Sequence, residues 1–285
     1  MKSAITICLV PEARSGPFVF HDGLVAGCRV AADLGFDGVE IFPESAAALD
    51  AAELMRVVAG HGLAVAAVGT GAGWVRHRLH LCDPDAAARA RAEDFIAAIV
   101  DRAGECGGPA IIGSMQGRSG EGMARDAALD HLAAALGRLG DRAARHGQSL
   151  LYEPLNRYET DLFNHQGEAA AFLADRGLSH VRLLADLFHM NIEEADLPAA
   201  LRAAGGRVGH VHWADSNRRA MGLGHTDPAP VVAALREIGY QGWLSAEVFP
   251  QPTAAEAAAR TMASVRRHVA DSPSGHPMAS SRPTS

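Results

Sequence analysis

The chain has a single lysine, Lys2, against 25 arginines in 285 residues. A lysine side chain is needed for Schiff-base catalysis, for holding pyridoxal phosphate and for the phosphate-binding loop of P-loop proteins. A lysine two residues from the N-terminus is poorly placed for any of these tasks. The scarcity of lysine therefore argues against all three kinds of active site.

Three further absences narrow the class of protein. The four cysteines, Cys8, Cys28, Cys82 and Cys106, form no CxxC pair, which favours reduced thiols in a cytoplasmic protein over a disulfide framework. The N-terminus lacks a signal-peptide pattern and no apolar run approaches about eighteen residues, so we expect neither secretion nor a membrane partner. A formal net charge of −7 disfavours nucleic acid as a partner, because phosphate binding requires a basic face.

Short β-branched runs alternate with longer helical stretches along the chain. Amphipathic segments such as 124–147 and 253–269 carry apolar residues at three- and four-residue spacing. Eight βα units in about 270 residues are typical of a (β/α)₈ barrel, so we predict an α/β TIM barrel, one domain over residues 1–270. A doubly wound sheet is the alternative, and the aperiodic tail 271–285 is predicted to be disordered. The strands are expected at 4–10, 37–42, 64–70, 109–114, 149–154, 181–187, 208–213 and 242–248.

Four acid or imidazole side chains stand at the ends of the last four expected strands: Glu153, Asp186, His212 and Glu247. Their positions differ by 33, 26 and 35 residues, each step being long enough for one helix, one strand and two loops. In a TIM barrel the carboxyl ends of neighbouring strands meet at one face. Unpaired charge there is costly, and this oxygen-rich set with one imidazole suits Mn²⁺, Mg²⁺ or Co²⁺. The sequence therefore predicts one divalent metal ion held by these four residues.

Other polar residues are candidates for contacts with a substrate. Glu40 closes the second expected strand and either reaches the site or caps a helix. Arg118 and His225 lie in the loops after the fourth and seventh strands, and Arg218 offers a bidentate fork for a carboxylate or hydroxyl group. The two arginines suggest an anionic or polyhydroxylated substrate. His210, one layer below His212, is interpreted as a core histidine or as the partner of a ligand.

Several segments resemble the xylose isomerase-like barrels that act as ketose 3-epimerases, such as the tagatose and psicose 3-epimerases. The segments are YEPLNRYETD (152–161), LLADLFHMNIEE (183–194), GHVHWADSNR (209–218) and SAEVFPQP (245–252). The longer stretch GHVHWADSNRRAMGLGHTD, together with AVGTG (67–71) and IIGSMQGR (111–118), is similar to the bacterial keto-sugar-acid epimerases, including 5-keto-L-gluconate epimerase. The similarity is specific over 150–250 and generic before residue 60.

The resemblance implies roles for individual residues. The four strand-end residues would be the metal ligands, and Glu153 and Glu247 would double as the two acid/base groups. Glu159, His189 and Arg218 match positions that hold substrate oxygens near the reacting carbons. The loops 72–84 and 115–123 would decide which sugar fits.

The chemistry of a ketose gives independent support. A proton next to a ketone becomes acidic enough to remove when a cation stabilises the enediolate that forms. Inversion then requires a proton to return to the opposite face, so an epimerase benefits from a second acid/base group. We therefore predict a metal-dependent epimerase of a small ketose or keto-sugar acid, which forms a homo-oligomer if its outer helices pair.

Other functions remain open. An aldose–ketose isomerase, like hydroxypyruvate isomerase, can shuttle its proton with one base and is the nearest alternative, followed by a dehydratase or C-glycoside lyase of the same barrel. An apurinic-site endonuclease would need extra histidines on the early strands, where the sequence has none. A non-catalytic sugar-binding module would not need both glutamates.

Overall fold

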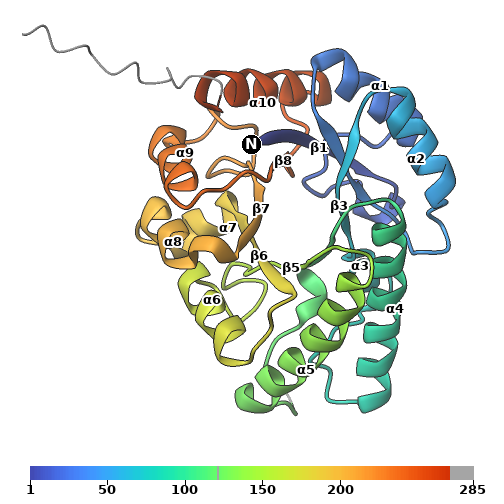
Figure 1. Cartoon of the computed structure of the whole chain (residues 1–285), viewed down its shortest axis with the longest axis vertical. Helices are drawn as coiled ribbons and strands as arrows, with labels where there is room; N and C mark the ends of the chain where they lie inside the picture. Colours follow the sequence, from blue (N-terminus) through green and yellow to red (C-terminus); the bar gives the residue numbers. More distant parts are fainter. Residues whose placement is uncertain (121, 270–285) are drawn as a thin grey trace, which may run out of the picture.

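Residues 1–120 and 122–269 are described by a computed structural model, and they form a closed barrel of eight parallel strands (Figure 1). Each strand pairs with the next along the chain, and β1 pairs with β8 to close the barrel. This confirms the predicted α/β (β/α)₈ fold and excludes a doubly wound sheet. The strands are β1 (Lys2–Cys8), β2 (Gly38–Phe42), β3 (Ala64–Gly69), β4 (Ala110–Ile112), β5 (Leu150–Tyr152), β6 (Val181–Asp186), β7 (Val208–His212) and β8 (Trp243–Ala246).

The long helices surround the strands (Figure 1). Several begin at an aspartate whose side chain accepts a backbone N–H of the first turn, as Asp50, Asp85 and Asp227 do, because the first turn of a helix has N–H groups without a partner. The helices of this outer layer are α1 (Leu24–Leu34), α2 (Ala51–Gly60), α4 (Ala86–Glu105), α5 (Arg125–Ala144), α6 (Gln166–Asp175), α8 (Leu197–Ala204), α9 (Pro228–Glu237) and α10 (Ala254–Val269).

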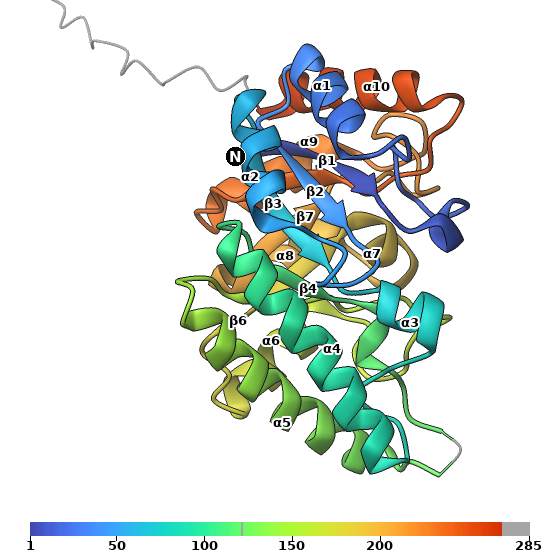
Figure 2. The same ribbon diagram turned by 90° about the vertical axis from the view of Figure 1, so that its right-hand side faces the viewer.

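Shorter helices lie in the loops. In the side view, β1 and β2 run towards the end of the barrel at which α3 lies (Figure 2). These segments are η1 (Pro11–Ala13), α3 (Ala72–His77), η2 (Ser114–Gln116), α7 (Leu187–Glu193) and η3 (Gly205–Arg207). All but η3 follow the carboxyl end of a strand, which is where TIM barrels carry their active sites.

Most of the core lies between the strands and the outer helices. A smaller apolar layer fills the inside of the barrel and consists of Ala67, Ile111, Leu151 and Leu184. Asp186 follows Leu184 by two residues and Glu153 follows Leu151 by two residues, so these acids project from the same face of their strands nearer the carboxyl end. The four cysteines are buried.

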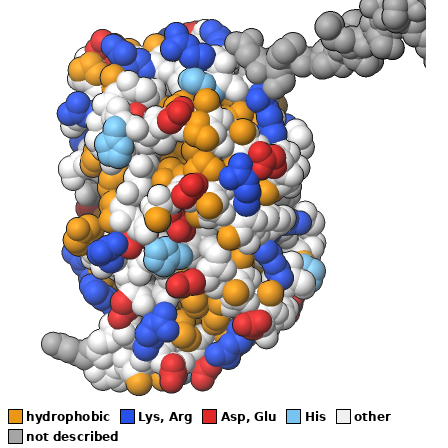
Figure 3. All heavy atoms as spheres, turned by 90° about the vertical axis from the view of Figure 1, so that its left-hand side faces the viewer, with side chains coloured by type: hydrophobic (Ala, Val, Ile, Leu, Met, Phe, Trp, Pro, Cys, Tyr) orange, Lys and Arg blue, Asp and Glu red, His pale blue; other side chains and the backbone are white. Residues whose placement is uncertain are grey.

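The outer surface of the barrel carries mixed charge. On the face with α6, α8 and α9, acidic and basic side chains are interspersed among apolar ones (Figure 3). Within the described residues, no helix is both long and apolar enough to cross a membrane. The predicted disordered tail, 271–285, lies outside the described residues.

Candidate active site

A cavity of about 340 Å³ opens at the carboxyl end of the barrel. Its polar lining includes Glu153, His189, His212 and Glu247, while Phe18, Phe42 and Trp74 contribute aromatic surface. A concave site with a few convergent polar groups is the usual form of a small-molecule site. The cavity therefore contains most of the residues that the sequence singles out.

The three carboxylates among the four predicted metal ligands surround the fourth ligand, His212. Nδ1 of His212 lies 3.3 Å from Oδ2 of Asp186, 3.5 Å from Oε1 of Glu153 and 3.6 Å from Oε2 of Glu247. The pairing of β6 with β7 sets Asp186 beside His212, while Glu153 and Glu247 follow the last residues of β5 and β8. The structure thus brings together all four residues.

The donor set fits a divalent cation. Ligand atoms of Glu153, Asp186 and His212 lie within 4.8 Å of one another. Oε1 of Glu153 is buried and has no hydrogen-bond partner among the described residues, which is costly unless a cation or a donor satisfies it. Three carboxylates and one imidazole are the hard, oxygen-rich ligands that Mg²⁺ and Mn²⁺ prefer.

The three carboxyl groups differ in acidity. Burial raises the pKa of Glu153 to about 7, and it raises the pKa of Glu247 although Arg218 opposes this. Burial also opposes the charge of Asp186, but the imidazole and guanidinium groups around it outweigh this and lower its pKa. For His212, burial would lower the pKa, yet the surrounding carboxylates raise it. The raised pKa values of the two glutamates thus distinguish them from Asp186, whose pKa is lowered.

His189 presents an N–H group to the cavity. Its Nδ1 lies 3.2 Å from the backbone N–H of Asn156, which can only donate, and 2.7 Å from the side-chain nitrogen of the same residue. Burial lowers the pKa of His189 to about 3, so the ring is neutral and its proton resides on Nε2. That atom is 3.8 Å from Oε1 of Glu153 and 3.7 Å from Oδ2 of Asp186. Glu159 also lines the cavity and accepts a hydrogen bond from Asn156 at 3.0 Å.

Arg218 reaches the same cluster from the loop after β7. Its guanidinium contacts Glu247, lies 3.5 Å from Oδ2 of Asp186 and covers the Phe188 ring at 4.8 Å. Its backbone has a φ of 57°, a conformation that residues other than glycine rarely adopt. Backbone hydrogen bonds of 2.8 Å to Asp215 and from Phe249 hold it there. This strained position aims the side chain at the carboxylates.

Asp215 organises the loop that carries Arg218. Its carboxylate accepts backbone N–H groups from Ser216, Gly222 and Gly224 at 2.7 Å and from Thr226 at 3.0 Å. Burial opposes the charge of Asp215, but these donors outweigh it and lower its pKa. Asp215 and Asn156 were not among the residues predicted from the sequence. Their only signal is a position inside WADSNR and YEPLNRYETD.

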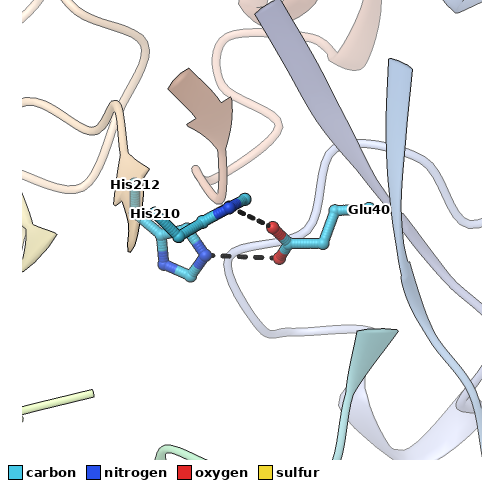
Figure 4. Close-up of side chains that lie close together, drawn as sticks. All are labelled: Glu40, His210 and His212. Atoms are coloured by element: carbon cyan, nitrogen blue, oxygen red, sulfur yellow. Dashed lines mark hydrogen bonds and ion pairs between the residues drawn. The ribbon is translucent and has the colours of Figure 1, made fainter. Parts of the chain in front are cut away.

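The remaining predicted substrate contacts are Glu40, Arg118 and His225. Glu40 borders the cavity, but its carboxylate faces two histidines of β7 (Figure 4). Arg118 is exposed on the loop after η2, near Asp161, and His225 is exposed on the loop after β7. Neither belongs to the cavity lining, so the structure does not bring these two side chains to the site.

Comparisons with known proteins agree with this geometry. A family model described as the xylose isomerase-like TIM barrel matches residues 28–265. The L-ribulose 3-epimerase of Mesorhizobium japonicum is 33% identical, over 76% of this chain and 72% of that protein. A ketose 3-epimerase of Arthrobacter globiformis is 28% identical, over 88% of this chain and 86% of that protein. Six other curated relatives, among them D-psicose 3-epimerases, are matched over 32% to 43% of their own length.

Solved structures show the same relationship over nearly the whole chain. An L-ribulose 3-epimerase superposes with a TM-score of 0.78 and 27% identity, covering 93% of this chain and 94% of that one. The 3-keto-D-glucoside 4-epimerase of E. coli superposes with a TM-score of 0.78 and 26% identity, covering 94% and 99%. The chain therefore belongs to the xylose isomerase-like TIM barrel family and is an enzyme of its sugar epimerase and isomerase group.

Proposed function

We propose that this enzyme is a divalent-metal-dependent epimerase of a small uncharged ketose, acting at the carbon next to the ketone. The observation that carries the proposal is the pair Glu153 and Glu247. Both border the cavity, both have a raised pKa, and they approach His212 from strands three positions apart around the barrel. Two separate acid/base groups are what inversion at one carbon requires.

Glu153, Asp186, Nδ1 of His212 and Glu247 would hold the metal. When bound, a cation such as Mn²⁺, Mg²⁺ or Co²⁺ would draw charge from the ketone oxygen and the neighbouring hydroxyl, which acidifies the proton to be removed. The fit is supported by the buried, unpartnered Oε1 of Glu153 within the described chain and by the three carboxylates around one imidazole.

The residues of the chain divide the proton transfer between them. One glutamate takes the proton from one face of the sugar, and the other returns a proton to the opposite face. The Nε2–H of His189 donates to a substrate oxygen as negative charge develops on the enediolate. Arg218 holds Glu247 in place, and Glu159 accepts from a sugar hydroxyl.

The charge of the cavity favours a neutral substrate. Among the described residues that border it, Arg218 is the one arginine or lysine, and its guanidinium is already engaged by Glu247 and Asp186. Glu12 and Glu159 add negative charge to the lining. A phosphate or carboxylate on the sugar would meet no free cation, so we favour an unmodified ketose over a keto-sugar acid. A cytoplasmic location and a homo-oligomeric state stay predictions.

Isotope exchange tests the proposal directly. The metal-loaded enzyme is incubated in D₂O with neutral ketoses, with their phosphates and with keto-sugar acids, and NMR locates the deuterium. We expect deuterium at carbon 3 of a neutral ketose, together with its epimer. An aldose product would show a one-base isomerase instead, and exchange confined to anionic sugars would refute the assignment of a neutral substrate.

A further inference from the structure

His212, one of the four candidate ligands, also belongs to a second buried cluster, in which it lies with Glu40 and His210 (Figure 4). Glu40 reaches across the barrel from β2 to the two histidines of β7. Its Oε2 lies 2.9 Å from Nε2 of His210, and its Oε1 lies 3.2 Å from Nε2 of His212. The side chains are 4%, 0% and 1% exposed, respectively.

Both carboxylate oxygens of Glu40 are engaged by histidines, although the residue borders the cavity. Each oxygen faces one imidazole nitrogen. A buried carboxylate must be paired to be tolerated, and the partners that the described structure provides are these two imidazoles. Glu40 therefore acts through the histidines.

The two nitrogens of His212 have different surroundings. Nδ1 faces the carboxylates of Glu153, Asp186 and Glu247, whereas Nε2 faces Glu40. An imidazole that binds a metal through Nδ1 keeps its remaining proton on Nε2, and that proton needs an acceptor. Oε1 of Glu40 is in the right place to accept it.

We propose that Glu40 is the positioning residue for the metal site: it fixes the orientation and tautomer of His212 so that Nδ1 is free to bind the cation. His210 completes the arrangement, because it holds the other oxygen of Glu40 and prevents the carboxylate from turning. The inference rests on the metal site of the proposed function but not on the reaction catalysed there.

Metal affinity without substrate is the test. Apo protein is titrated with Mn²⁺ and Co²⁺ against a fluorescent chelator, and the visible spectrum of bound Co²⁺ reports the ligand geometry. Glu40→Gln should weaken binding about 10–100-fold, the usual cost of losing the partner of a metal-binding histidine, and should alter the Co²⁺ spectrum. His210→Gln, which loosens Glu40 without removing it, should give a smaller loss.

Thr6→Val is the matched control. Thr6 pairs with Glu40 in the β1–β2 ladder, is equally buried and donates to the carbonyl oxygen of Ala246 at 3.0 Å. Within the described part of the chain, Thr6 has no hydrogen bond to an imidazole. The unfolding temperature of Thr6→Val should fall. Its metal affinity should stay within about twofold of wild type, a much smaller change than the loss of about 10–100-fold expected of Glu40→Gln.

Each outcome decides between interpretations. Unchanged metal affinity in Glu40→Gln, with a wild-type enzyme that binds metal, overturns the inference and leaves the proposed function intact. Equal losses in Glu40→Gln and Thr6→Val also overturn it, because the effect is then general destabilisation. Two metal ions per wild-type chain, reduced to one by Glu40→Gln, would show that Glu40 is itself a ligand. Weakened binding in a protein that epimerises no ketose supports the inference and refutes the proposed function.

Discussion

The two halves of the barrel make different contributions to the site. The half from β5 to β8 supplies most of the ionisable groups of the site: Glu153, Asp186, His189, His212, Arg218 and Glu247. The half from β1 to β4 supplies mainly the wall, with Phe18, Phe42 and Trp74. The groups proposed for the chemistry and the aromatic wall therefore reside mostly on different strands, and Glu40 on β2 is the exception.

Glycines in the β1–β4 half leave space next to the charged residues of the β5–β8 half. A Cβ atom at Gly69 would come within 2.7 Å of the Phe42 ring, and one at Gly71 within 2.9 Å. A Cβ atom at Gly113 would overlap the carboxylate of Glu153. The chain thus carries no side chain at these positions at the ends of β3 and β4, and this leaves room for a sugar beside the acids of the β5–β8 half.

The strongest test of this division removes charge from the β5–β8 half. Glu153→Gln and Glu247→Gln should each slow epimerisation by about 10²–10⁴-fold, the usual contribution of a general acid or base. Rates of epimer formation and of α-proton exchange into D₂O are measured in both variants. A variant that keeps the base for one epimer should still exchange the proton of that epimer while forming no product.

Metal content must be determined in both variants, because each glutamate is also a proposed ligand. Gly113→Ala is a useful companion, since it displaces the Glu153 carboxylate without changing its chemistry. Full metal content with near-normal turnover in either Gln variant would contradict the two-base mechanism and favour a one-base isomerase.

The sequence predicted the fold and the convergence of the four strand-end residues because both depend on local periodicity. Once eight strands are recognised, the positions of Asp186 and His212 at strand ends follow from the alternation of side chains along a strand. The partner of Glu40 could not be predicted in this way. Its carboxylate meets residues 170 and 172 positions away, and only closure of the barrel through β1 and β8 brings β2 near β7.

Loop residues were harder still. Asn156 and Asp215 act through backbone N–H groups and side-chain geometry within loops, which hydrophobic periodicity does not report. Arg118 and His225 were proposed because their loops lie at the correct end of the barrel, but a loop can turn a side chain to solvent, as both do here. Position in a βα loop therefore identifies a face of the barrel and not a contact.

An intermediate effect is expected from Arg218→Ala. The change leaves Glu247 and Asp186 without the guanidinium that contacts both. Loss of a charged hydrogen bond should reduce transition-state stabilisation, calculated from the ratio of kcat/KM values, by about 1.5–3 kcal/mol. Steady-state kinetics on the accepted ketose measures the loss, with Arg219→Ala on the same loop as the control. Unchanged kcat/KM would show that Glu247 and Asp186 keep their functional positions without this guanidinium.

The smallest effect is expected from a substitution in the β1–β4 half, Arg76→Ala on α3. The guanidinium of Arg76 lies 3.0 Å from Oε1 of Glu12 and 2.7 Å from Oε2 of Glu44, so it joins the loops after β1, β2 and β3 at the rim of the cavity. Partly exposed ion pairs contribute at most about 1 kcal/mol each, so Arg76→Ala should change the free energy of unfolding little.

Its kinetic signature should nevertheless be specific. A looser rim should raise KM about two- to fivefold with kcat nearly unchanged, because uniform binding is lost while the proton transfer is not. Arg138→Ala is the control, since it breaks an equally close pair with Glu93, at 2.6 Å, on the outer helices α4 and α5. If Arg76→Ala lowered kcat as strongly as a change in the β5–β8 half, the wall would take part in the chemistry and the separation between the two halves would not hold.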